Sequence, residues 1–170
     1  MKRILLVVGL VFALPFVMAD SCGGGTGGTA AGGAAAGSPA AVKPVAVGTA
    51  MKDSSGESVT VVSFKRGFST GNEFDVPKAG DEYVQVTYKL VNGSSSEWTL
   101  PLSELTLIDA NGQKYNEAFV SSGEDTIDSL AAGGHADAAH DVYEVPTGTA
   151  IDVVWQPNLF ETTVYQTALT

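Results

Sequence analysis

The sequence predicts an all-β fold: an immunoglobulin-like antiparallel β-sandwich of about seven or eight strands. Apolar residues between positions 42 and 170 recur at every second position, which is the period of a half-buried strand. Gly and Pro residues separate these runs at short intervals. No window of twelve residues has the spacing of an amphipathic helix. Together these patterns predict one domain over residues 45–170, built from two packed sheets.

The clearest strand is predicted over residues 81–91. Its apolar side chains alternate with polar ones, and they are Val84, Val86, Tyr88 and Leu90. This alternation predicts one face against the core and one face toward solvent.

An earlier strand is predicted over residues 58–64, where both faces carry apolar side chains. Val59 and Val61 share one face, and Val62 and Phe64 share the other. This pattern is typical of a strand covered on both sides.

Further strands are predicted at 98–102, 105–107, 135–145, 149–155 and 162–169. Trp98 and Trp155 fall in these runs at positions that predict burial in or near the core. Between two of the runs, the segment 109–112 ends in Asn-Gly, which favours a tight hairpin turn because these residues tolerate a positive φ.

The N-terminus has the pattern of an export signal. Lys2 and Arg3 precede an apolar run over residues 4–19, which is short for a bilayer-spanning helix. We therefore expect a lipoprotein signal peptide at residues 1–21.

The single cysteine follows this run in the segment Ala19-Asp20-Ser21-Cys22. The segment resembles a bacterial lipobox, in which the thiol is acylated and becomes the new N-terminus. Ala19 and Asp20 depart from that pattern, which has Leu and a small or apolar residue at these two places. The alternative is cleavage after Ala19, which would release a soluble secreted protein.

The residues after Cys22 read as a flexible linker that ends near residue 44. Positions 23–41 contain eight Gly and seven Ala among nineteen residues, without a charge or a large apolar side chain. Such a stretch buries too little surface to offset its ordering entropy. We expect it to hold the folded domain above a membrane surface by a reach of roughly 25 Å.

Charge and cysteine content exclude several classes of protein. The chain carries 19 acidic and 9 basic residues, a net charge of −10. A chain this acidic is a poor ligand for a phosphate backbone, so no nucleic-acid partner is expected. One cysteine forms no disulfide framework and no multi-cysteine metal site. We expect no cofactor, and a monomer.

Several segments together resemble a telokin-like, immunoglobulin-like domain of unknown function, number 4352. That family occurs in bacterial lipoproteins and is related in fold to mycobacterial secreted antigens. The segments that carry the resemblance are Lys78–Val86, Leu105–Tyr115, Leu130–Gly134, Val142–Pro146 and Ile151–Pro157. The resemblance implies the sandwich fold and an exported address. It supplies no catalytic residue, so we expect a protein that is not an enzyme.

The loop from Lys65 to Lys78 is the best candidate for recognition of a partner. It carries Phe68 and Phe74 among glycines and polar residues, and loops of sandwiches commonly bear binding residues. The alternative is that these aromatic side chains close the end of the sandwich.

The two histidines supply a candidate metal site. Counting by twos places His135, Asp137 and Asp141 on one strand face and His140 on the other, unless a bulge brings the histidines together. Asp137 and Asp141 also stand where the resembled family is apolar.

These observations lead to one expected function. We expect a non-catalytic binding module at the outer face of the bacterial cytoplasmic membrane, held there by a lipid on Cys22, with an unknown protein or ligand as its partner. The alternative is a soluble secreted metal-binding protein or hydrolase that uses the region of His135, Asp137 and His140.

Overall fold

The structure is a computed structural model and describes residues 43–100, 104–157 and 163–169. The predicted signal peptide, Cys22 and the linker up to residue 42 lie outside the described residues. Within the described part, every regular element is a strand, and no helix there is long and apolar enough to cross a membrane.

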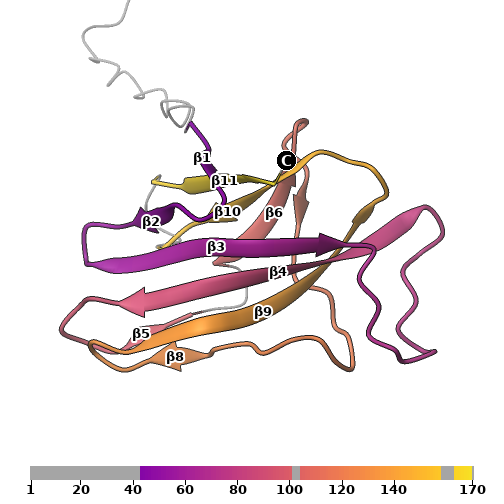
Figure 1. Cartoon of the computed structure of the whole chain (residues 1–170). Helices are drawn as coiled ribbons and strands as arrows, with labels where there is room; N and C mark the ends of the chain where they lie inside the picture. The colour runs from indigo at the N-terminus through magenta and orange to yellow at the C-terminus, as the bar shows by residue number, and fades with distance from the viewer. Residues whose placement is uncertain (1–42, 101–103, 158–162, 170) are drawn as a thin grey trace, which may run out of the picture. The chain divides into compact units, whose positions relative to one another are not determined.

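Two larger sheets form the domain (Figure 1). The four-stranded sheet has the order β2 (Ala50–Lys52), β3 (Glu57–Arg66), β4 (Asp81–Asn92) and β9 (His135–Pro146). The five-stranded sheet has the order β1 (Val45–Ala46), β11 (Tyr165–Leu169), β10 (Ile151–Trp155), β6 (Leu105–Asp109) and β7 (Lys114–Tyr115). A two-stranded ribbon pairs β5 (Trp98–Thr99) with β8 (Ser129–Leu130).

The core lies between these sheets and confirms the predicted sandwich. Alternate residues of β4 are buried with side chains of β10, as the two-residue period requires. Trp98 and Trp155 are buried as predicted, and their ring centroids lie 6.0 Å apart. The apolar core is therefore continuous from one sheet to the other.

One pairing departs from the expected antiparallel arrangement. β1 pairs with β11 in parallel, through Val45 with Thr167 and Ala46 with Ala168. β1 is the first and β11 the last strand of the described residues, so no tight hairpin joins them. Without a hairpin, the two strands are able to pair in parallel.

The prediction that β3 is apolar on both faces is wrong, because β3 contains a bulge. The register with β4 shifts between Val61 and Ser63, so the extra residue Val62 turns outward and is 46% exposed. After this bulge, Phe64 packs against the same core as Val59 and Val61. One inserted residue reverses the alternation for the rest of a strand.

The prediction that His135, Asp137 and Asp141 share one face of β9 is wrong, because β9 also contains a bulge. Leu90 pairs with Ala136 and Tyr88 with Ala139, so Asp137 and Ala138 together lie opposite Lys89. Asp137 turns outward and forms an ion pair of 2.8 Å with Lys89. Asp141, in contrast, faces the core and is 9% exposed.

The predicted turn at residues 109–112 is confirmed as the connection between β6 and β7. Gly112 has a φ of +83°, and its N–H donates to the Asp109 carbonyl at 3.0 Å. The Asp109 carboxylate also accepts from the backbone N–H of Asn111 and Gln113, at 2.8 and 2.9 Å. The hairpin is therefore fixed by local hydrogen bonds.

Candidate functional site

Two loops meet at one end of the four-stranded sheet (Figure 1). Loop 67–80 joins β3 to β4, and loop 116–128 joins β7 to β8. Ser121 of the second loop donates from its backbone N–H to Asp75 Oδ2 of the first at 2.9 Å, and its hydroxyl donates to the same oxygen. The Asn72 amide donates to the Ser121 hydroxyl at 2.7 Å, and these contacts join the loops into one unit.

The Asp75 carboxylate is the centre of this junction. The hydrogen bonds from Ser121 hold the pKa of Asp75 below its usual range, because they stabilise the charged form. A further bond, from the Ser122 hydroxyl to the Thr70 carbonyl at 2.9 Å, joins the same two loops.

Phe68 of the first loop packs against Gly123 of the second. Its side chain is half-buried, and its ring lies so close to Gly123 that a Cβ added there would be 2.4 Å from the Phe68 Cζ. Gly123 also has a φ of +93°, which side chains rarely adopt. The Lys65 ammonium lies 5.6 Å from the centroid of the Phe68 ring.

Three large apolar side chains remain exposed on these loops. Phe74 is 85% exposed, Val76 is 69% exposed and Phe119 is 96% exposed. Phe74 and Val76 flank Asp75, and Phe119 lies two residues before its partner Ser121. We call Phe74, Val76 and Phe119 the apolar surface. Exposed apolar residues scattered singly need no explanation, whereas these three side chains lie on two loops that hydrogen bonds join.

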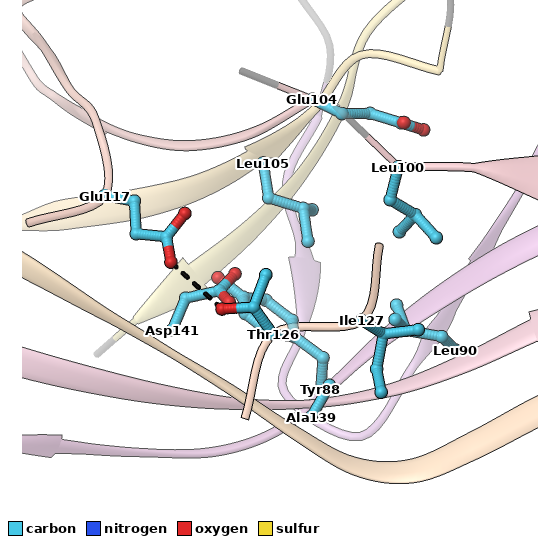
Figure 2. A pocket seen from close by; sticks show the side chains of 10 residues that line it. All are labelled: Tyr88, Leu90, Leu100, Glu104, Leu105, Glu117, Thr126, Ile127, Ala139 and Asp141. Carbon is cyan, nitrogen blue, oxygen red and sulfur yellow. Dashed lines mark hydrogen bonds between the residues drawn. The ribbon is translucent and has the colours of Figure 1, made fainter. Parts of the chain in front are cut away.

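A small cavity lies inside the sandwich and is lined in part by loop 116–128 (Figure 2). Its volume is about 30 Å³, which is enough for a water-sized molecule and far below the usual size of a substrate pocket. Its polar lining comes from Tyr88, Glu104, Glu117, Thr126 and Asp141. Among the described residues that line it, none is basic.

Asp141 reaches the cavity from β9 with two buried tyrosines beside it. The Tyr143 hydroxyl donates to Asp141 Oδ2 at 3.3 Å, and the hydroxyls of Tyr88 and Tyr143 lie 3.0 Å apart. Burial, assisted by the charge of Glu117, raises the pKa of Asp141 to about 7. Burial also raises the pKa of both tyrosine hydroxyls.

Loop 116–128 adds two carboxyl groups to the same region. The Thr126 hydroxyl donates to Glu117 Oε1 at 3.2 Å, as Figure 2 shows, and burial raises the pKa of Glu117. Burial raises the pKa of Glu124 to about 7, and the charges of Glu117 and Asp75 add to the effect. Glu124 Oε1 is buried without a hydrogen-bond partner among the described residues.

Glu104 has different partners, although it is also buried. It is 2% exposed, and its Oε1 accepts from the indole N–H of Trp155 at 2.8 Å and of Trp98 at 3.3 Å. Burial raises the pKa of Glu104 to about 7, while these two hydrogen bonds oppose the rise.

The predicted metal candidates lie on the outer face of the four-stranded sheet. The bulge in β9 brings His135 and His140 onto one face, because they pair with Val91 and Thr87, which share a face of β4. His135 Nε2 lies 3.8 Å from Asp137 Oδ2, and both side chains are more than half exposed. Across the described residues, no group of three or more His, Cys, Asp or Glu is placed to hold a metal ion.

The sequence pointed to Phe68 and Phe74 as contact residues, but not to Phe119. Phe119 belongs to an irregular segment without alternation, and nothing local in the sequence shows that it meets loop 67–80. Glu104 was not singled out either. Asp141 was assigned to the same face as Asp137, whereas its side chain faces the core and is 9% exposed.

Comparison with known proteins identifies relatives by sequence pattern and by fold. A family model described as a domain of unknown function, DUF4352, matches residues 46–164. Among curated proteins, none matches the chain.

Several solved structures share the fold. The yjhA protein of Bacillus subtilis has a TM-score of 0.58 at 18% identity, over 74% of this chain and 99% of that one. The secreted protein MPT63 of Mycobacterium tuberculosis has a TM-score of 0.53 at 18% identity, over 75% and 98%. A protein of Bacillus subtilis described as a "putative lipoprotein", ycdA, has a TM-score of 0.53 at 10% identity, over 69% and 38%. At these identities the likeness shows the fold.

Proposed function

This chain belongs to the DUF4352 family of domains of unknown function, and from that premise we propose that it is an exported, membrane-anchored binding module without catalytic activity. The single observation that carries the binding role is the apolar surface on the two joined loops. Because a fold does not define a function, the proposal is argued from the residues of this chain.

Cys22 supports the anchoring part of the proposal. It follows a basic start and an apolar run, and a linker rich in Gly and Ala follows it. Acylation at a single N-terminal cysteine places more than one chain in the bilayer, which stable attachment requires. The acidic domain would be repelled by anionic headgroups, so the lipid has to supply the hold on the membrane.

Labelling with palmitate tests this anchor. We expect the full-length chain to incorporate palmitate in a bacterial host and the Cys22→Ala variant to lose the label. Ser21→Ala is the matched control, since it keeps a small residue before the cysteine and should still be labelled. Equal labelling of Cys22→Ala and the parent chain would refute the anchor and favour the soluble secreted alternative.

The apolar surface supports the binding part. Phe74 and Phe119 are held by backbone and side-chain hydrogen bonds at Asp75 and Ser121, so little loop entropy remains to be lost on contact. Aromatic side chains give a large contact area with few rotatable bonds. We therefore assign contact with the partner to Phe74 and Phe119, and positioning of loop 67–80 to Phe68.

Site-specific photo-crosslinking in the native cell envelope tests this surface. A benzophenone amino acid at position 74 or 119 should give the same discrete adduct, and Phe74→Ser should reduce the adduct formed from position 119. The matched control is the same probe at Asn111, an exposed turn residue at the β6–β7 hairpin. An adduct of equal yield from position 111, or none from either loop, would contradict the proposed surface.

The alternative function keeps one observation in its favour, the placement of His135 and His140 on one face of β9. Against it, Lys89 already pairs with Asp137, which would have to release this ammonium to bind a metal. Metal analysis of the purified protein distinguishes the two functions. A stoichiometric metal that is lost in the His135→Ala variant would overturn the proposed binding module in favour of the alternative.

A further inference from the structure

We propose that protons shared among Asp141, Glu117 and Glu124 control how firmly loop 116–128 is fastened to β9, and thereby whether Phe119 is held beside loop 67–80. This inference rests on the proposed function, because it describes the regulation of the apolar surface. The surface would be rigid in acid and loosened as the surroundings approach neutrality.

The loop is fastened to β9 at two points. At the first, the Ala118 N–H donates to the Val142 carbonyl at 2.7 Å. At the second, Asp125 and His140 exchange backbone hydrogen bonds of 3.0 and 3.3 Å. Phe119 and Ser121 lie between these points, so the position of the exposed ring depends on both attachments.

The carboxyl groups lie where the loop meets the strand. Asp141 comes from β9, between the two residues that accept the loop, while Glu117 and Glu124 come from the loop near its two attachments. Glu117, Thr126 and Asp141 all line the cavity, and Figure 2 shows the Glu117 carboxyl group joined to the Thr126 hydroxyl. The loop therefore closes over the strand by bringing acidic groups together.

Among the described residues that line the cavity, none carries a positive charge that could pair with these carboxyl groups. The groups that face Asp141 are Tyr143 from its own strand, Tyr88 from β4, and Glu117 and Glu124 from the loop. Glu104, which directly precedes β6, is the remaining titratable residue among those that line the cavity. Farther out, Asp128 acts on Glu117 and Asp75 acts on Glu124, and both are acidic as well.

The direction of the titration follows from burial. The pKa of Asp141 and that of Glu124 are raised to about 7 in the closed structure, and that of Glu117 is raised too. Opening the loop returns these groups to water, where a carboxyl pKa is about 4. Opening is therefore coupled to release of protons between about pH 4 and pH 7, so the closed loop is favoured in acid and loses that advantage as the pH rises.

Hydrogen exchange of the full chain between pH 5 and pH 8 tests the coupling. The readout is exchange in peptides spanning residues 117–125, divided by the intrinsic exchange rate at each pH. For each linked proton, the opening constant should rise about tenfold per pH unit up to about pH 7 and then level off. Peptides from β4 report global unfolding and should exchange more slowly than the loop at every pH.

Substitutions assign the effect to the named groups. Asp141→Asn keeps an oxygen that can accept from Tyr143, so the variant should fold, and it should reduce the rise between pH 5 and pH 7 by at least about tenfold. The combined variant Asp141→Asn, Glu117→Gln and Glu124→Gln should make the opening constant independent of pH. Glu104→Gln is the matched control, because Glu104 titrates in the same range but binds the indoles of the core.

A second control removes the histidine whose backbone fastens the loop. His140→Gln leaves the backbone bonds to Asp125 in place and should keep the rise, which would exclude imidazole titration as its cause. A wild-type opening constant that does not change with pH, or an unchanged rise in the combined variant, would overturn the proposal. Neither result concerns palmitate labelling or crosslinking, so failure of the proton coupling is distinguishable from failure of the binding module.

Discussion

Two buried carboxyl groups of this sandwich have the same raised pKa and different surroundings. Glu104 accepts hydrogen bonds from Trp98 and Trp155, which are both part of the core. Asp141 accepts one bond, from Tyr143, and the carboxyl groups that repel it, Glu117 and Glu124, belong to a loop. We call them the indole-bound region around Glu104 and the loop-covered region around Asp141.

The difference shows that burial alone does not decide what a carboxyl group does. In the indole-bound region, the donors are held by packed rings, with Trp155 stacked on Tyr165 at 4.9 Å, so titration has no mobile element to act on. In the loop-covered region, the groups that repel Asp141 belong to a surface loop, which is held by hydrogen bonds and not by packed rings. The same titration can therefore move the loop.

The largest expected loss of stability comes from a substitution in the indole-bound region. Trp155 is fully buried, so Trp155→Ala should lower the free energy of unfolding by about 3–5 kcal/mol, through lost burial and the cavity left behind. Trp155→Phe is the matched control. It keeps most of the ring and removes the N–H donor to Glu104, so it should cost less, about 1–3 kcal/mol. Urea unfolding measures both, and equal losses would show that the hydrogen bond carries most of the effect.

The next effect concerns both regions and depends on pH. Both carboxyls have a folded-state pKa raised to about 7, so their stability contribution is full below about pH 4 and is lost as the pH rises through 7. As the pH rises from about 4 to about 7, each of these carboxyl groups should lower the free energy of unfolding by up to roughly 1.4 kcal/mol per pH unit. Urea unfolding at pH 5 and pH 8 should show a smaller difference in both Glu104→Gln and Asp141→Asn than in the parent chain. A domain that is equally stable at both pH values would contradict the raised pKa values.

A smaller loss of stability is expected when the contact between the two loops at Gly123 is disturbed. Gly123→Ala places a Cβ against the Phe68 ring and forces an unfavourable φ, so it should cost about 1–3 kcal/mol. Hydrogen exchange should increase in loops 67–80 and 116–128 before it increases in β4. Gly112→Ala is the control for the backbone term, since open space surrounds that position although its φ is also positive. Equal effects of the two substitutions would mean that contact with Phe68 contributes nothing.

The smallest effect on stability is expected at the apolar surface. Phe74→Ser and Phe119→Ser should each change the free energy of unfolding by no more than about 0.5 kcal/mol, because both rings are almost fully exposed. Thermal unfolding measures this directly. A large loss would show that the rings pack against the domain, and their role as contact residues would then have to be abandoned.

The sequence predicted β4 well because a single regular alternation covers it. Its inward residues from Val84 to Leu90 are buried, as the pattern required. The sequence did not predict the faces of β3 and β9 correctly, because each contains a bulge. Both bulges lie next to Tyr88, which pairs with Val61 on one side and Ala139 on the other. A bulge leaves no consistent mark in a run of Val, Ser, Asp and Ala, so the reversal of faces is decided by the pairing of the strands.

The sequence indicated one of the two loops that form the candidate site. Phe74 stands out in a glycine-containing loop, and its exposure agrees with a recognition role. Phe119 and the bonds between Ser121 and Asp75 join positions 46 residues apart, and the two loops have no shared pattern in the sequence. Their meeting follows from the pairing of the strands, because β4 lies between β3, which leads into loop 67–80, and the part of β9 that holds loop 116–128.

By itself, the sequence determined the all-β class, the turn at residues 109–112 and the burial of both tryptophans, because alternation and turn chemistry act between near neighbours. It also determined the acidity of the domain, which is a property of composition. Only the tertiary structure decided that Asp137 faces solvent while Asp141 faces the core, that Glu104 receives two indole N–H groups, and that Phe74 and Phe119 lie on joined loops. Each of these depends on register and on contacts between distant segments, and a local pattern does not encode such contacts.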